Sequence, residues 1–388
     1  MLYSPYPPHQ SSWGRLVENY WLKRVIVKNK RDLRFDSLRG LMILCMTANH
    51  LPTRLRALTD ESLGLFSAAE GFVFLSGLMA GWIYTRKLRE TNQDTLLKQC
   101  RERVKTIYLW HIVAFVTCLV LVILSSHLFG FASFNTPRLF YQNPLLALIL
   151  GSVFLQQPGL LDILPMYCVM YALLPLALKW IEAGYRNTVL MISFTIWLIT
   201  QFAPPIDTIS FFPVVLGSFN LYAWQFIFIL GVIAGNTRLN KNENIKPRFS
   251  LILGASIVIL ACLSIQHLGW RPAWSDKFFG VSLNKPALGF MRLTNFGCVA
   301  YIITLIGSKF PHLFSWPKLA FLGKHSIAVF ATQSVTAMIL LQFGRFFTTI
   351  TGDIICTSIS ISLLYLAAYI RDLWQNKPDK VASNTLTK

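Results

Sequence analysis

Apolar runs long enough to cross a membrane recur along the whole chain, and they limit its fold more than any other feature. A helix needs about 20 mostly apolar residues to cross a bilayer. Of the 388 residues, 54% are hydrophobic and only 14% are charged, whereas a soluble domain carries roughly 25% charged residues. The sequence therefore predicts an all-α polytopic membrane helix bundle with about ten transmembrane helices. The predicted spans are residues 37–53, 65–84, 106–126, 164–181, 188–203, 218–236, 250–267, 293–308, 320–343 and 350–370.

Basic residues set the expected orientation of these spans, because Lys and Arg concentrate in cytoplasmic loops. Segments 85–105 and 238–248 are both strongly basic, so we expect both on the cytoplasmic side. An even number of spans must then separate them, which excludes the apolar run 140–156 as a crossing. This run contains Asn143 and Pro144 and is predicted to be a re-entrant or interfacial element. Both termini are then cytoplasmic.

The expected organisation is a membrane domain with a cytoplasmic segment at each end. Residues 1–35 precede the domain, and within them 13–28 is either an amphipathic helix on the membrane surface or a basic tether. Residues 36–370 form the transmembrane domain, and 371–388 form a tail. Loop placement explains the net charge of +19, so this charge does not indicate nucleic-acid binding. The seven scattered cysteines predict neither a disulfide framework nor a metal site.

The first predicted span carries the most informative polar residues, because ionisable groups inside a membrane are costly and often functional. Arg39 and His50 are eleven residues apart, which puts them on one helix face about 16 Å apart. Arg39 is either a snorkelling anchor or a functional cation. His50 is either a hydrogen-bonded core histidine or a catalytic base. Glu70 in the second span either orients His50, caps its own helix or pairs with a nearby arginine.

Other polar residues gather at the expected outer ends of spans. Asp162 precedes the fourth span, where it is either a helix cap or a site residue. Three residues that open the sixth span suit sugar binding but also an ordinary interface. They are Asn220, Trp224 and Gln225. Three more approach the eighth span and are candidates for holding an anion. They are Lys285, Arg292 and Asn295.

Polar residues at the expected inner ends are candidates for binding phosphates. Within the basic segment these are Arg86, Arg101 and Arg103, although topology alone also explains them. The ninth span contributes Lys324 and His325 near its inner end and Gln333 further along.

Several of these residues belong to short motifs that follow one another along the chain. The motifs are RDLRFDSLRGL at 31–41, FSAAEGFVFLSG at 66–77, LDILP at 161–165, AWQF at 223–226 and LGKHS at 322–326. Together they resemble the OpgC family, whose members carry succinyl groups onto osmoregulated periplasmic glucans. The resemblance covers about residues 31–370. That family is similar to the wider acyltransferase type 3 superfamily, in which an Arg, ten residues and a His mark the first span. Arg39 and His50 fit this spacing.

The resemblance implies an acyltransferase of the bacterial inner membrane. It implies that His50 is the catalytic base and that Arg39 organises the path of a cytoplasmic acyl-CoA, expected to be succinyl-CoA. The acyl-CoA is a co-substrate, and neither a permanently bound cofactor nor a metal is expected. The acceptor is a periplasmic glucan or another glycan, and a glucan synthase is a conceivable partner. Asn49 and Ser67 stand where the family usually has Asp, so two carboxylates expected near His50 are absent.

The expected mechanism uses His50, oriented by Glu70, to remove a proton from a sugar hydroxyl that attacks the thioester. Transfer is either direct or passes through an acyl-enzyme. Lys285 or Arg292 binds the free carboxylate of a dicarboxylic donor. Supporting or acceptor-binding roles are expected for the remaining candidates, Asp36, Asn49, Asp162, Asn220, Trp224, Gln225 and Asn295. Two other function classes stay open, namely a glycan or lipid transporter or flippase, and an assembly partner of a glycan synthase.

Overall fold

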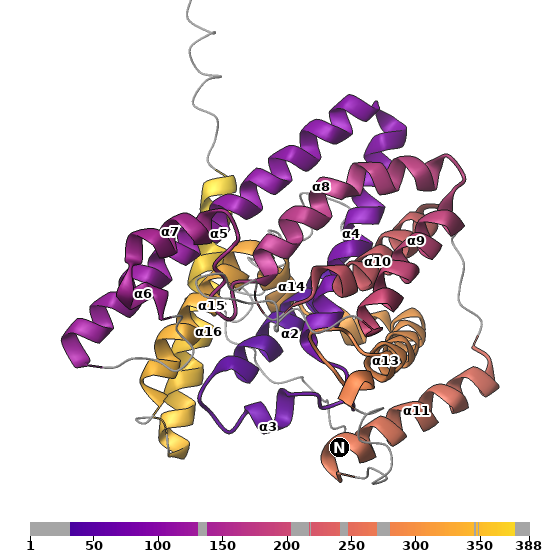
Figure 1. Ribbon diagram of the computed structural model, residues 1–388. Helices are drawn as coiled ribbons and strands as arrows, with labels where there is room; N and C mark the ends of the chain where they lie inside the picture. The colour runs from indigo at the N-terminus through magenta and orange to yellow at the C-terminus, as the bar shows by residue number, and fades with distance from the viewer. Residues whose placement is uncertain are drawn as a thin grey trace, which may run out of the picture.

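The described part of the chain is helical throughout its regular structure. The computed structural model describes residues 32–130, 138–202, 219–240, 247–269, 280–344 and 349–376, with the single residues 217 and 347. Within these residues there is no β-strand, which confirms the predicted all-α class (Figure 1). The stretch 13–28, nearly all of the N-terminal segment 1–35 and the tail beyond residue 376 lie outside the described residues.

A helix occupies each predicted span. These helices are α2 (Leu33–His50), α4 (Ala68–Glu90), α5 (Gln93–Phe129), α8 (Ile163–Glu182), α9 (Arg186–Phe202), α10 (Leu221–Asn240), α11 (Phe249–His267), α13 (Phe290–Lys309), the pair α14 (Pro317–Lys324) and α15 (Ser326–Gln342), and α16 (Ile350–Gln375). Shorter elements lie in the connections. They are α3 (Arg56–Thr59), α6 (Leu139–Gln142), α7 (Pro144–Ser152) and the 3₁₀ turn η3 (Pro311–Phe314).

Several of these helices have the length and composition of membrane spans. Within the described residues α5, α8, α11, α13 and α16 are long and apolar enough to cross a membrane, and a sixth span results if α14 and α15 count as one. The composition is therefore that of a multi-pass membrane protein. The other long helices in predicted spans, α2, α4, α9 and α10, are not among these candidates. The count of about ten crossings and the cytoplasmic placement of both termini stay predictions.

The run 140–156 forms α6, a break and α7. Nine residues of α-helix in α7 extend about 14 Å, which is too short for a hydrocarbon core of about 30 Å. Pro144 begins α7, and the Asn143 side chain accepts a hydrogen bond from the Leu146 N–H at 3.0 Å. This geometry agrees with the predicted re-entrant or interfacial element.

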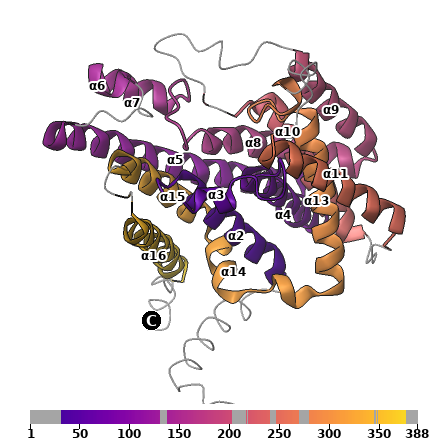
Figure 2. The same ribbon diagram turned by 90° about the horizontal axis from the view of Figure 1, so that it is seen from below.

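Glycines allow the central helices to approach closely. On α4, a Cβ at Gly77 or Gly81 would overlap backbone carbonyls of α10. A Cβ at Gly231 or Gly235 of α10 would in turn overlap carbonyls of α4. Both helices thus carry glycines four residues apart, a pattern that lets membrane helices pack backbone to backbone. Figures 1 and 2 show α4 and α10 side by side.

The predicted span 320–343 is broken, which the sequence analysis did not foresee. Helices α14 and α15 meet at 87° around His325. Gly323 lies against the Asp36 backbone so closely that a Cβ would overlap its carbonyl oxygen. The helix therefore turns here after α14 has packed along α2, and Figure 2 shows these two helices next to each other.

Polar side chains tie several helix ends together at one end of the bundle. Arg89 of α4 donates to Glu182 of α8 at 2.8 Å, and Asn236 of α10 donates to the same carboxylate at 2.7 Å. Arg238 of α10 pairs with Asp32, the N-cap of α2, at 2.6 Å. This common end supports placing segments 85–105 and 238–248 on the same side, although residues 241–246 lie outside the described residues.

Candidate active site

One cavity lies where α2 ends and where α4 and α8 begin. It has a volume of about 380 Å³, and we call it the outer cavity. Apolar residues such as Met46 and Phe330 form much of its wall. Its polar lining is more varied. The polar residues that line it are Asn49, His50, Arg56, Asp60, Ser67, Asp162 and Lys285.

His50 is the last residue of α2 and contributes its ring to this lining. Its Nδ1 lies 2.8 Å from Nε2 of Gln333, a fully buried residue of α15. No hydrogen bond of Nε2 on His50 is found among the described residues. The ring is therefore anchored through one nitrogen, and the other is available to a molecule in the cavity.

Glu70 does not orient His50, contrary to the sequence-based prediction. Its fully buried carboxylate accepts hydrogen bonds from Arg292 at 2.9 and 3.1 Å. The other carboxylate oxygen accepts from the N–H of Ser67 at 2.9 Å and from the Ser67 hydroxyl, which completes a capping box at the start of α4. No contact among the described residues joins Glu70 to His50. The capping alternative is correct, and the partner is an arginine 222 residues further along the chain.

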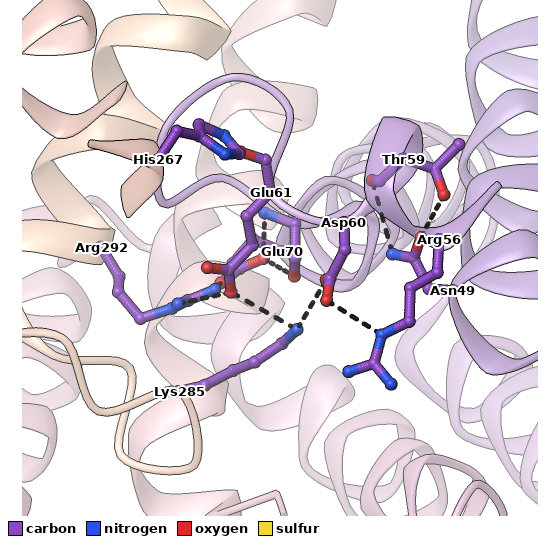
Figure 3. Close-up of polar contacts among 10 residues, drawn as sticks. Asn49, Arg56, Thr59, Asp60, Glu61, Glu70, His267, Lys285 and Arg292 are labelled. Atoms are coloured by element: carbon purple, nitrogen blue, oxygen red, sulfur yellow. Dashed lines mark hydrogen bonds and ion pairs between the residues drawn. The ribbon is translucent and has the colours of Figure 1, made fainter. Parts of the chain in front are cut away.

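Arg292 also binds a second carboxylate, that of Glu61, at 2.8 Å (Figure 3). Glu61 has a positive φ of 54°, which is uncommon for a residue other than glycine. His267 at the end of α11 lies 3.2 Å from the Glu61 carbonyl oxygen through its Nε2. The loop between α3 and α4 is thus fixed by α11 and α13. Arg292 does not line the outer cavity.

Lys285 is the predicted anion-binding residue that does face the outer cavity. Its Nζ lies 3.9 Å from Asp60 and 3.6 Å from Glu61, and its side chain is 38% exposed. Asp60 also pairs with Arg56 at 3.4 Å. These separations are longer than those around Arg292, so the Lys285 ammonium is only loosely held (Figure 3).

Asn49 and Asp162 both line the outer cavity. Asn49 accepts a hydrogen bond from the Thr59 hydroxyl, which ties α2 to α3. Asp162 is buried and precedes α8, but its side chain forms no hydrogen-bonded cap on that helix. Asp162 therefore lies both at the N-terminus of α8 and next to the cavity, so the helix-dipole and site alternatives both stay open.

The predicted sugar-binding group of α10 does not line the outer cavity. Asn220 caps α10 by accepting from the Tyr222 N–H at 2.9 Å. Trp224 is fully buried and donates from Nε1 to the Pro286 carbonyl at 3.0 Å. Gln225 bonds to Ser193 of α9. These side chains hold helices and a loop, as the ordinary-interface alternative predicted.

Asn295 has a similar structural contact. Its Nδ2 donates to the Leu63 carbonyl at 2.9 Å, so it fixes the loop before α4. It does not line the outer cavity, and the anion-holding role predicted for it has no support here.

A second cavity lies at the opposite end of α2. It has a volume of about 240 Å³, and we call it the inner cavity. The start of α5, the end of α4, the α14–α15 break and the end of α16 surround it. The charged residues and the histidine that line it are Asp36, Arg39, Arg103, Lys324, His325 and Arg371.

The four predicted phosphate-binding arginines divide into two pairs. Arg39 and Arg103 line the inner cavity. Arg86 instead forms an exposed pair with Glu90 at 2.7 Å, and Arg101 faces a separate surface hollow. The first pair thus shares one cavity and the second pair lies outside it, and phosphate binding stays a prediction.

A narrow neck lies between the two cavities. Its volume is about 20 Å³, and Arg39, Arg103 and Ser326 line both it and the inner cavity. Phe330 lines both the neck and the outer cavity. Arg39 donates to the Ser326 hydroxyl at 2.5 Å and lies over the Phe72 ring, while its Nε is buried without a hydrogen bond among the described residues. The guanidinium thus stands where the inner cavity narrows.

Sequence analysis missed two residues at the inner end, because α16 extends beyond the predicted span end at 370. Arg371 lines the inner cavity. Asp372 is fully buried and lies 2.9 Å from Lys324 and 3.3 Å from His325. The sequence signal that could have identified them is an acidic residue that directly follows a basic residue at the end of a predicted span.

Comparison with known proteins gives one match. A family model described as OpgC protein matches residues 31–376, nearly the whole chain. The matched region includes α2 to α16 and all residues that line both cavities. No curated protein matches the chain, and no solved structure does.

Proposed function

Because the chain belongs to the OpgC protein family, we propose that it is an inner-membrane O-acyltransferase that moves an acyl group from cytoplasmic acyl-CoA to a periplasmic glucan. The family indicates a glucan-modifying acyltransferase. The acyl-CoA donor, the direction of transfer and the inner membrane are what the resemblance to the family implies, and two cavities at opposite ends of one bundle support separate sites for donor and acceptor. One observation carries this inference, namely that His50 and a basic cavity lie at opposite ends of one bundle with a neck between them.

The charges that line the cavities suit two different substrates. Four cationic side chains and one carboxylate line the inner cavity. CoA is a polyanion because of its phosphates, and arginine binds phosphate oxygens in a bidentate way. Two cationic side chains and two carboxylates line the outer cavity. This balance suits an uncharged glucan, whose hydroxyls form hydrogen bonds with both kinds of group.

The neck gives the donor a route to His50. In the proposed complex the CoA phosphates stay near Arg39 and Arg103, and the thioester arm extends past Phe72 and Phe330. Arg39 and His50 belong to one continuous helix, and eleven residues of helix extend about 16 Å. The thioester arm of acyl-CoA must therefore be extended to reach His50. Arg39 then contacts the phosphates, and His50 contacts the reacting groups.

The chemical step needs one general base. Nε2 of His50 takes the proton of a glucan hydroxyl while the hydroxyl oxygen attacks the thioester carbonyl carbon. The C–S bond then breaks, the ester forms, and CoA leaves as a thiolate. His50 returns its proton to this thiolate, so the enzyme ends unchanged. Direct transfer of this kind needs no covalent acyl-enzyme.

Lys285 supports a dicarboxylic acyl group such as succinyl. Its ammonium lines the outer cavity and is held only loosely by Asp60 and Glu61. A free carboxylate on the acyl group can form a closer ion pair with it. Lys285→Met should therefore reduce the preference for succinyl-CoA over acetyl-CoA and leave transfer from acetyl-CoA largely intact.

The decisive assay uses purified protein in lipid nanodiscs with labelled succinyl-CoA and glucan oligosaccharides. Acylated glucan should form with the wild-type protein and not with His50→Gln. His312→Gln, at an exposed histidine of η3, is the matched control and should keep full activity. A transporter would instead move glucan across a vesicle membrane without acylating it. An assembly partner would do neither unless the synthase were added.

A further inference from the structure

We propose that Gln333 is the positioning residue of His50, and that its side-chain amide selects the imidazole tautomer that can act as a base. The inference rests on the proposed function, because it assigns how the same histidine is prepared. Gln333 approaches from α15, whereas His50 ends α2. The contact thus joins two helices far apart in sequence at the outer cavity.

The geometry of Gln333 leaves few alternatives for its role. The residue is fully buried, and its amide nitrogen lies 2.8 Å from Nδ1 of His50. Its Oε1 is also buried and makes no hydrogen bond among the described residues. In either orientation of the amide, one of its two polar groups bonds to Nδ1 and the other stays buried without a hydrogen bond among the described residues, which costs stability. A contact kept at that cost is a candidate for function.

Both orientations of the amide fit the same space. The oxygen and nitrogen of a glutamine side chain are nearly identical in size and are distinguished only by their hydrogen bonds. As the amide is placed, Nε2–H of Gln333 donates to Nδ1, and the ring proton then lies on Nε2 of His50. A half-turn about the last side-chain bond brings Oε1 to Nδ1 of His50 instead. In that orientation Nδ1–H donates to Oε1, and Nε2 carries the lone pair toward the cavity. This is the tautomer that removes a proton from a glucan hydroxyl.

No carboxylate takes this position among the described residues. Glu70 is held by Arg292 and Ser67, and Asn49 is held by Thr59. The charged groups that share the outer cavity with His50 are Arg56, Asp60, Asp162 and Lys285. None of them forms a described hydrogen bond with the ring. An uncharged amide therefore orients His50, and it fixes the tautomer without strongly stabilising the imidazolium.

The test compares Gln333→Leu, Gln333→Glu and a matched control in the nanodisc assay. Gln342→Leu removes another glutamine of α15, one that bonds to Ser125 rather than to His50. Gln333→Leu should lower kcat at least about tenfold with little change in the KM for acyl-CoA, since tautomer control is part of general-base catalysis. Gln342→Leu should keep the wild-type kcat.

Gln333→Glu separates positioning from packing. The carboxylate keeps an acceptor for Nδ1–H and adds a charge that stabilises the imidazolium. Activity should exceed that of Gln333→Leu, and the acidic limb of the kcat–pH profile should move to higher pH. A variant that only disturbs packing would lower the amount of folded protein without moving this limb.

The outcomes distinguish this inference from the proposed function. If His50→Gln is inactive while Gln333→Leu keeps the wild-type kcat and pH profile, the positioning role is wrong and the function stands. If His50→Gln is fully active, the proposed function fails first. Equal profiles for Gln333→Glu and wild type would also overturn the positioning role.

Discussion

Arg292 donates two hydrogen bonds to the fully buried carboxylate of Glu70, at 2.9 and 3.1 Å. The same guanidinium binds Glu61 at 2.8 Å. One arginine thus fixes both ends of the loop that leads from α3 into α4. This loop carries Asp60 and Ser67 to the wall of the outer cavity. The network shapes the cavity without entering it.

Loss of Arg292 should therefore impair folding more than chemistry. Arg292→Ala would leave the buried Glu70 carboxylate without a cation and Glu61 with only the more distant Lys285 ammonium. Removing one partner of a buried ion pair typically costs about 3–5 kcal/mol. The thermal unfolding midpoint in detergent should fall sharply, and less folded protein should be recovered. Arg86→Ala is the control, because its pair with Glu90 is exposed, and its midpoint should not change. If Glu70→Gln instead kept wild-type stability and lost kcat, Glu70 would belong to the chemistry after all.

Two arginines of α5 provide a matched test of the inner cavity. Arg103 lines the cavity and Arg101 does not. Arg103→Ala should raise the KM for acyl-CoA at least about tenfold, because a charge-assisted hydrogen bond contributes about 1.5–3 kcal/mol, while Arg101→Ala should leave it unchanged. Arg39→Lys should also raise this KM, since an ammonium cannot bind a phosphate in a bidentate way. Titration of acyl-CoA at saturating glucan measures both effects. Equal KM values for the Arg101 and Arg103 variants would show that the CoA phosphates do not bind in the inner cavity.

The neck should limit the acyl groups that reach His50. Phe330 stacks on Phe72 with ring centroids 6.0 Å apart, and Phe330→Leu should widen the passage. The ratio of kcat/KM for a six-carbon donor to that for succinyl-CoA should rise. Phe115→Leu, in a fully buried position of α5 that does not line the neck, tests whether any core change has this effect. A ratio that rises equally in both variants would exclude the neck as the selective element.

The ties between helix ends predict which positions share a side of the membrane. In a background without the seven cysteines, Arg101→Cys and Arg248→Cys should both resist an impermeant thiol reagent in intact spheroplasts. Leu58→Cys, at a position 70% exposed in α3, should react. Both inner positions should react after the membrane is opened. Labelling of only one of the two inner positions in intact cells would contradict the predicted topology.

Much of the fold was predictable because membrane helices are encoded by long apolar runs. Each predicted span contains a helix, and α7 within 140–156 is shorter than a membrane span needs. The bend at His325 was not predictable from hydropathy. Next to this bend, Gly323 meets the Asp36 backbone, a contact between residues 287 positions apart. Only the folded structure brings them together.

The candidate site was predictable only where it depends on local helix geometry. The spacing of Arg39 and His50 along one helix follows from local geometry alone. As that spacing predicted, the two residues lie at opposite ends of α2, where Arg39 lines the inner cavity and His50 the outer cavity. The partners of these residues depend on distant contacts. Sequence position predicted Glu70 as the partner of His50, but the Glu70 carboxylate is bound by Arg292 instead. Gln333 takes its place from a helix near the end of the chain.

The central proposal is that His50 removes the proton of a glucan hydroxyl, and His50→Gln tests it most directly. Glutamine keeps a similar polar size but has no nitrogen that can accept a proton near neutral pH. Acylated glucan formed by purified protein from labelled succinyl-CoA should be measured by intact mass, with protein recovery and the KM for acyl-CoA as folding checks. We predict a loss of kcat of at least about a hundredfold with the KM nearly unchanged. Wild-type rates of acylated glucan formation by His50→Gln would contradict the proposal.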